Sequence, residues 1–368
     1  MLFAFFSSVS HIFSCQNRVT LCSNVFLISN KQFLRHSWDD FYKGEERIRI
    51  TQDEFSNYEF ISNANYYLKN LIIQDLTANA ILFVSQTDIK FLTEECTFSN
   101  ITTKVATKEN TGNWDDSQAG AFFFEAKSSE CAINRCSADK CYNKITSSYY
   151  YLDGGNFASI RFAPNKILMT TIQLCAPSKY GVNAFRSRNT SGNYTGLNIS
   201  SCNTYDTPMF TKFPGDDDSI KYSIFDGNTA NSVSFGIAVV YSGKLTIDSC
   251  CFSDNSVSYL IYSSHSVNVI LKNSIFIDNQ IRYLAYADSG NGGSGNTYSK
   301  IYIQNCYFDD TKTSVSSVSG AYISKDNANN SSLKNEIMKE IGSYLHTPPI
   351  THGQFIYQLK LRRARAKF

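Results

Sequence analysis

The sequence predicts an all-β protein, a single right-handed parallel β-helix of about ten coils with short capping segments. Three observations predict it: a repeat of about 22–32 residues, two or three short strand patterns in each repeat, and turn residues between them. The 368 residues include 27 Phe and 23 Tyr, yet only 18% are charged. This composition is typical of many short strands and turns.

The repeat is clearest in three segments that share the pattern Φ-x-Φ-x-[SN]-[CS]-x-F-x-D-[ND], where Φ is apolar: residues 245–255, 269–279 and 301–310. Residues 95–100 and 222–228 are looser copies, and a further copy at 71–79 carries Leu76 at the Phe position. A sandwich or propeller leaves the recurring Cys or Ser before Phe unexplained. The stacked coils of a β-helix place equivalent positions above each other at about 4.8 Å.

The repeat also predicts which side chains form the core. Its Cys and Phe positions are occupied by Cys96, Phe98, Cys250, Phe252, Phe276, Cys306 and Phe308. We interpret Cys136, Cys175 and Cys202 as the same Cys position in the middle coils, where the Cys acts as a small buried apolar residue. The Asn that ends each copy suits a turn with left-handed backbone, and stacked Asn side chains are expected to hydrogen-bond along the column.

Each period contains strands only. The alternation Φ-x-Φ-x predicts one strand, and a second apolar run precedes it, as at residues 235–241, 259–262 and 283–286. No room remains for a helix, which disfavours helical solenoids and leucine-rich repeats.

Composition divides the chain into five parts. Residues 1–14 are a candidate signal peptide, apolar enough but without a basic start, so cleavage stays open. Residues 15–57 form an N-terminal segment and cap, residues 58–324 the β-helix, and residues 325–347 a C-terminal cap with helical spacing. Residues 348–368 form a loose basic tail. No apolar run is long enough for a transmembrane segment.

The net charge of +2 comes from the tail, because residues 358–368 hold five Lys or Arg and no acid, so the remainder carries 2 − 5 = −3. An acidic body gives no basic surface for nucleic acid. The tail could touch anionic lipid or RNA, but a solvated and frayed terminus is the interpretation that we favour.

The short [SN]-C-x-F-x-[DN]-N repeats resemble those of the pectin-lyase-like right-handed β-helix superfamily. They are similar to repetitive surface proteins of trichomonad protists and, more distantly, to chlamydial polymorphic outer-membrane proteins, although the chlamydial G-G-A-I tetrapeptide is absent. The resemblance covers residues 58–324 and implies a secreted or surface-displayed protein with an adhesion role. Such a repeat supports the fold more strongly than the function.

Because that superfamily includes polysaccharide lyases and hydrolases, we searched for a catalytic set. The acidic string Asp216, Asp217 and Asp218 resembles part of the polygalacturonase motif, but the accompanying N-T-D, G-H-G and R-I-K are missing. With Arg186 or Arg188 the string could form a calcium-dependent lyase site if the residues meet in neighbouring coils. An exposed acidic turn is the simpler interpretation. No zinc, haem or other cofactor spacing is present.

The function that these features favour is non-catalytic binding of a glycan or a cell-surface protein along the flank of the helix, on the outside of a cell. The alternative is a polysaccharide lyase or glycoside hydrolase. Tyr149, Tyr150 and Tyr151 form an aromatic cluster suited to stacking on sugars. Secretion would make the N-x-[ST] sequons glycosylation candidates at Asn100, Asn189, Asn193, Asn198 and Asn330.

Overall fold

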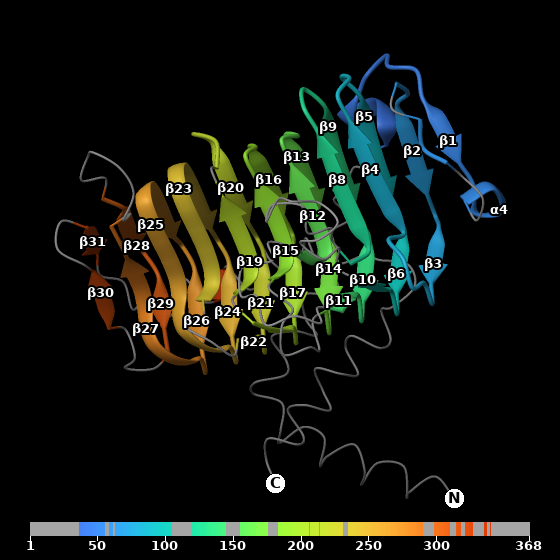
Figure 1. Cartoon of the computed structure of the whole chain (residues 1–368). Helices are drawn as coiled ribbons and strands as arrows, with labels where there is room; N and C mark the ends of the chain where they lie inside the picture. Colours follow the sequence, from blue (N-terminus) through green and yellow to red (C-terminus); the bar gives the residue numbers. More distant parts are fainter. Residues whose placement is uncertain are drawn as a thin grey trace, which may run out of the picture.

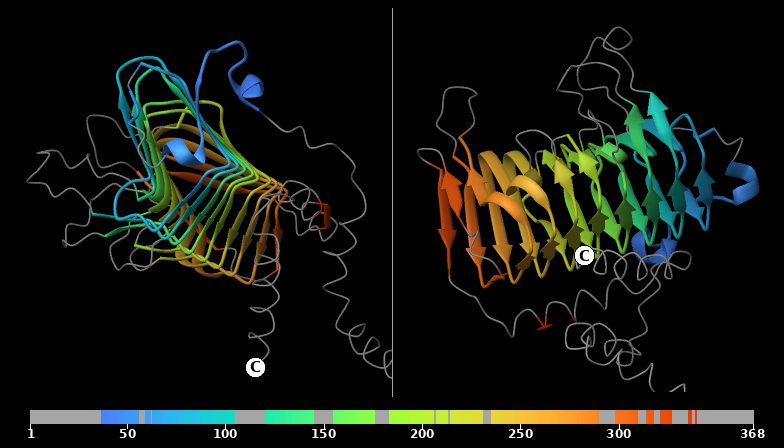
Figure 2. Two further views of the ribbon diagram at one scale, coloured as in Figure 1. Left: turned by 90° about the vertical axis from the view of Figure 1, so that its right-hand side faces the viewer. Right: turned by 90° about the horizontal axis from the view of Figure 1, so that it is seen from below.

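The computed structural model describes residues 37–55, 59–61, 63–104, 120–144, 155–175, 183–205, 207–212, 214–230, 235–289, 298–309, 314–317, 321–326, 335, 336 and 339. The predicted fold class is confirmed, since these residues wind into one long stack of parallel strands, a parallel β-helix (Figure 1). Viewed along its axis, successive coils superimpose (Figure 2).

Three strands in each coil build three long faces, which we call the first, second and third sheets. The first sheet contains β1 (Ile48–Ile50), β2 (Tyr66–Lys69), β5 (Lys90–Glu94), β9 (Glu130–Asn134), β13 (Asn165–Leu168), β16 (Gly192–Thr195), β20 (Asp218–Lys221), the second halves of β23 (Phe235–Asp248) and β25 (Ser256–Lys272), β28 (Lys300–Gln304) and β31 (Tyr322–Lys325). The second sheet contains β4 (Ile81–Ser85), β8 (Phe122–Ala126), β12 (Gly155–Arg161), β15 (Asn183–Arg188), β19 (Thr207–Lys212), the first halves of β23 and β25, β27 (Gln280–Ala287) and β30 (Val315–Ser317).

The third sheet has nine strands, close to the ten coils that the sequence predicts. They are β3 (Ile72–Gln74), β6 (Thr97–Ser99), β10 (Ser137–Asp139), β14 (Thr171–Gln173), β17 (Asn198–Ser200), β21 (Ile224–Asp226), β24 (Cys251–Ser253), β26 (Ile275–Ile277) and β29 (Tyr307–Phe308). Short pairs extend some coils, and they are formed by β7 (Thr102–Lys104), β11 (Tyr142–Lys144), β18 (Asn203–Thr204) and β22 (Thr229–Ala230).

The centre of each third-sheet strand points into the core and forms one column. Strand register stacks Ile73, Phe98, Ala138, Ile172, Ile199, Phe225, Phe252, Phe276 and Phe308. The last four rings lie parallel, with centroids 5.0, 5.0 and 4.9 Å apart. In the first copy Ile73 occupies the Phe position, so the assignment of that position to Leu76 is wrong by three residues.

Two further buried columns flank this centre, one at each corner. The column two residues before the centre contains Leu71, Cys96, Cys136, Thr170, Leu197, Ser223, Cys250, Ser274 and Cys306. The column three residues after it runs from Leu76 through Ile101, Cys141, Cys175, Cys202, Asn228, Asn255 and Asn279. Cys136 therefore holds its predicted place, whereas Cys175 and Cys202 belong to the opposite corner.

A single left-handed residue makes each of these corners. The residues just before and just after the third-sheet strands have φ between 46° and 67°, and most of them are not glycine. Their amides continue the ladder between coils: Glu95 donates to the Asn134 carbonyl at 3.0 Å, and Asn100 to the Asp139 carbonyl at 3.0 Å. The chain thus turns without losing its inter-coil hydrogen bonds.

The predicted Asn ladder is confirmed, one residue after the left-handed corner. The Asn228 amide donates to Asn255 Oδ1 at 3.1 Å, and the Asn255 amide donates to Asn279 Oδ1 at 2.9 Å. Each amide also donates at 2.8 Å to a third-sheet carbonyl, that of Ile199, Phe225 or Phe252. The ladder satisfies polar groups that the corner buries.

The N-terminal segment of 15–57 divides into three parts within the described residues. β1 pairs with β2 and is a regular strand of the first sheet. The helix α4 (Gln52–Phe55) lies at the end of the stack, where a cap is expected (Figure 1). The helix α3 (Trp38–Phe41) instead packs its buried Trp38 against Tyr67 on the outer face of the first sheet, with ring centroids 5.9 Å apart.

Candidate functional site

The acidic string does not form a carboxylate cluster. Asp216 and Asp217 are exposed in the turn before β20, while Asp218 opens that strand and points into the core with 1% of its surface exposed. A glycosidase needs two carboxylates on one accessible face. The string therefore supplies an exposed pair and a separate, sealed acid.

Arg186 lies elsewhere, on β15 of the second sheet. Its neighbours along that strand, Phe185 and Ser187, face the core, so Arg186 points away from the core. It is nevertheless fully buried, with its guanidinium 5.3 Å from the centroid of the Phe210 ring. Asp218 faces inward on the first sheet. The structure thus does not bring the predicted acids and arginine together, and no group of three His, Cys, Asp or Glu suited to a metal occurs in the part of the chain it describes.

The candidate glycosylation sites differ in accessibility. Asn100 and Asn193 are exposed and Asn189 is half-buried. Asn198 is only 1% exposed at the start of β17, so a glycan cannot be attached to it in the folded chain. Asn330 and the aromatic cluster 149–151 lie outside the described residues.

The cysteines are packing residues. All nine in the described ranges are buried free thiols. Burial raises the pKa of the Cys136, Cys175 and Cys202 thiols well above the ordinary value, so they stay protonated. Their S–H groups donate to backbone carbonyls, as Cys202 does to Ser200 at 3.5 Å.

An aromatic patch, missed by the sequence analysis, covers the outer face of the second sheet near its C-terminal end. We define it as the half-buried rings of Phe235, Tyr259, Tyr262, Tyr283 and Tyr286. Parallel register stacks Phe235, Tyr259 and Tyr283 in one row, and Tyr262 with Tyr286 in another. Within the rows the centroids are 5.6–5.9 Å apart.

Polar groups border the aromatic patch. The exposed Arg282 holds its guanidinium 5.3 Å from the Tyr283 ring centroid, and the Tyr262 hydroxyl donates to Asp288 at 3.3 Å. Burial is the main cause that raises the pKa of Tyr262, to about 12, and it also raises the pKa of Tyr286. Both hydroxyls therefore keep their protons at neutral pH and can donate hydrogen bonds. The sequence signal was the 24-residue spacing of YLIY and YLAY, which the sequence analysis treated only as apolar runs.

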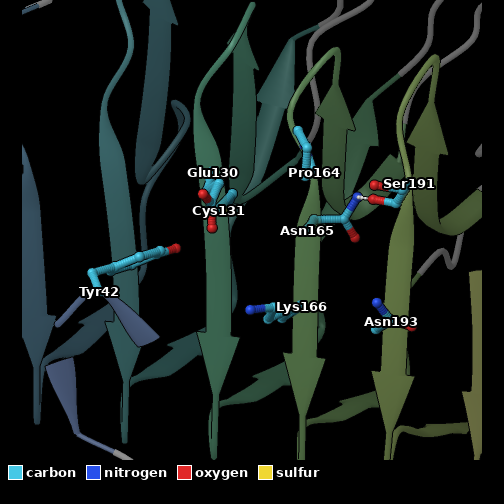
Figure 3. A pocket seen from close by; sticks show the side chains of 8 residues that line it. All are labelled: Tyr42, Glu130, Cys131, Pro164, Asn165, Lys166, Ser191 and Asn193. Atoms are coloured by element: carbon cyan, nitrogen blue, oxygen red, sulfur yellow. Dashed lines mark hydrogen bonds between the residues drawn. The ribbon is translucent and has the colours of Figure 1, made fainter. Parts of the chain in front are cut away.

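A second polar feature lies on the first sheet, where residues of three coils line a small hollow of about 130 Å³ (Figure 3). Lys166 and Asn193 come from the outer face of β13 and β16, and Tyr42 follows α3. At the inner end Asn165 donates its amide to the Ser191 carbonyl at 3.1 Å. Opposite charges on Lys166 and Glu130 line the same opening.

In the described residues no helix is long and apolar enough to cross a membrane. Comparison with the models of known protein families and with curated proteins finds no match for this chain.

Proposed function

We propose that this chain is a non-catalytic, secreted or surface-displayed β-helix protein that binds a partner through the aromatic patch. The proposal keeps the adhesion role implied by the resemblance to repetitive β-helix surface proteins. The observation that carries it is the patch itself: five half-buried rings gathered on one face, bordered by an exposed Arg282. Tyr and Arg dominate the energetics of many binding surfaces, because they offer large, rigid contact area with a polar end.

A glycan suits this patch better than a folded protein does. Rows of ring edges and hydroxyls recur at the coil spacing, so a polymer of repeating units lying along the axis meets the same chemistry at every step. Tyr hydroxyls and Arg282 offer hydrogen bonds to sugar hydroxyls, while the rings cover their apolar faces. Binding to a host protein is the other possible outcome, and the test below distinguishes it from glycan binding.

The enzymatic alternative has no supporting observation in the described residues. Its carboxylates and Arg186 lie on different sheets, and Asp218 is closed off from solvent. Catalysis needs groups positioned around one substrate.

The test is a glycan array together with binding to cells from which surface glycans have been enzymatically removed. We expect a set of related glycans to bind, and Tyr259→Ala to lose that binding. Binding that survives glycan removal and depends on surface protein would replace the glycan with a protein ligand. Depolymerisation of a polysaccharide that Asp217→Asn abolishes would overturn the non-catalytic assignment.

A further inference from the structure

An interruption in the apolar interior of the first sheet marks a second site. At one inward position the column contains Cys131, Asn165, Gly192, Asp218 and Leu245 along the axis. Pairing of Asn193 with Ser219 places Asp218 directly beside Gly192. Three successive coils thus place a polar residue or a glycine at the position where the coils on either side place Cys131 and Leu245.

Tyr194 occupies the space that Gly192 leaves. A Cβ atom on Gly192 would lie 1.9 Å from the Tyr194 hydroxyl oxygen, so the ring folds back over the glycine. The phenol oxygen therefore lies between Asn165 and Asp218 in the column. Both the glycine and the tyrosine are needed for this arrangement, because any other residue at 192 would displace the hydroxyl.

Four oxygens at this place accept no hydrogen bond of good geometry from the described residues: Asn165 Oδ1, the Tyr194 hydroxyl and both carboxylate oxygens of Asp218. The Gly192 and Gly215 amides approach the Asp218 carboxylate, and Ser187 and Asn165 approach the Tyr194 hydroxyl, without satisfying them. Asn165, Tyr194 and Asp218 are 2%, 0% and 1% exposed. The Asn165 amide nitrogen is already committed to Ser187 Oγ at 3.2 Å and to the Ser191 carbonyl at 3.1 Å. Burying polar oxygens without partners is costly, so an occupant is expected.

The charge of this group of oxygens is negative. Burial raises the pKa of Asp218 to about 6, opposed by the nearby Gly192 and Gly215 amides and assisted by Asp217 and Asp216 on its own turn. The groups on the neighbouring strands β13, β15, β16 and β23 are Asn165, Ser187, Tyr194 and Leu245, and none of them is a cation or a carboxylate. No Lys, Arg or His in the described ranges forms an ion pair with Asp218.

We propose that Asn165, Tyr194 and Asp218 form a buried binding site for a monovalent alkali cation, Na⁺ or K⁺. Oxygen-only donors suit a hard cation, and the single carboxylate balances one positive charge. A divalent ion would need more carboxylates than this site offers. The hollow on the outer face of the first sheet reaches one member of this group, Asn165 (Figure 3). The cation then stabilises the stacking of three coils in the middle of the β-helix.

The experiment compares thermal unfolding of the full chain in NaCl, KCl and choline chloride at equal ionic strength and pH 7.5. Because the ion binds only the folded chain, we expect Na⁺ or K⁺ to raise the midpoint saturably by about 2–4 °C over choline. Asp218→Asn should abolish this difference. Asp217→Asn, the same change one residue earlier but exposed, should retain it.

A second variant keeps the test decisive if Asp218→Asn does not fold. Tyr194→Phe keeps the ring and removes the hydroxyl oxygen, so the difference in midpoint between NaCl or KCl and choline chloride should fall at least twofold. Equal midpoints in all three salts at pH 7.5 would overturn the proposal and leave water as the occupant. A full effect that persists in Tyr194→Phe or in Asp218→Asn would overturn it as well.

Discussion

The side chain of Gln52 pairs with the backbone of Ile72 as if it were another strand. Gln52 Nε2 donates to the Ile72 carbonyl at 2.9 Å, and the Ile72 amide donates to Gln52 Oε1 at 2.6 Å. Ile72 opens β3, the first strand of the third sheet. One amide side chain from α4 therefore closes part of the edge that a parallel solenoid leaves exposed at its first coil.

Removing this contact should expose the edge. We expect Gln52→Ala to lower the free energy of unfolding by about 1 kcal/mol, the value of a solvent-accessible hydrogen-bonded pair, and to increase self-association. Urea denaturation and light scattering measure the two effects. Gln74→Ala removes an exposed Gln from the same strand and serves as the control. Equal behaviour of the two variants would show that Gln52 has no capping role.

The Asn ladder makes a stronger prediction, because its members are buried. Asn255→Ala removes the acceptor that the backbone and side-chain amides of Asn228 share, and it removes the side-chain donor to the Phe225 carbonyl. We expect a loss of about 3 kcal/mol in the free energy of unfolding, measured by urea denaturation. Asn268→Ala, an exposed Asn on the same strand β25, should cost much less. A small loss at Asn255 would mean that the ladder is not a significant source of stability.

The left-handed corners predict that some substitutions stabilise the protein. Leu174 has φ 52° and is 43% exposed, so its side chain contributes little packing while its backbone is strained. Leu174→Gly should raise the free energy of unfolding by up to about 1 kcal/mol. Leu174→Ala removes the same side chain without relieving the backbone, and it should not stabilise. Thermal unfolding of both variants distinguishes these effects, and a stabilised Leu174→Ala would refute the explanation by strain.

Asp218 predicts a pH dependence when alkali cations are replaced by choline. Its folded-state pKa of about 6 lies above the unfolded value of about 3.9, so the folded chain holds the proton more tightly. Its contribution to stability is complete below about pH 4 and is lost as the pH rises through 6, a change on the order of 3 kcal/mol.

The difference in unfolding free energy between wild type and Asp218→Asn, measured from pH 4 to 8, isolates this contribution. As the pH rises through about 6, the wild type should lose unfolding free energy relative to Asp218→Asn. The difference should then become constant. Asp217→Asn, the same change at the exposed neighbouring acid, is the control. A flat difference for Asp218→Asn would contradict the raised pKa.

The repeat predicted the parallel β-helix and the Asn ladder because both depend on residues that recur at one spacing. It failed where two positions accept the same residue type. Cys fits either corner of the third-sheet strand, so Cys175 and Cys202 were assigned to the wrong column by five residues. The repeat pattern favours Leu76 over Ile73 wrongly for the same reason, since either residue could fill an apolar position.

The two proposed sites depend on features that a repeat does not encode. Tyr259 and Tyr262 frame the buried Leu260 and Ile261, and only the local backbone decides that the two rings face outward. Asn165 and Asp218 share one column, two coils apart with Gly192 between them, because coils of unequal length stack in register. Aligning the first-sheet strands would have shown three coils with a broken apolar column.

The most direct test of the proposed function is the affinity of the aromatic patch for the glycan that the array identifies. Tyr259→Ala and Tyr283→Ala remove rings from the patch, whereas Tyr302→Ala removes a half-exposed ring from the outer face of the first sheet. We expect each patch variant to weaken binding by at least about tenfold, or 1.4 kcal/mol, in isothermal titration, with Tyr302→Ala unchanged. Equal affinities for all three variants would contradict binding through this face.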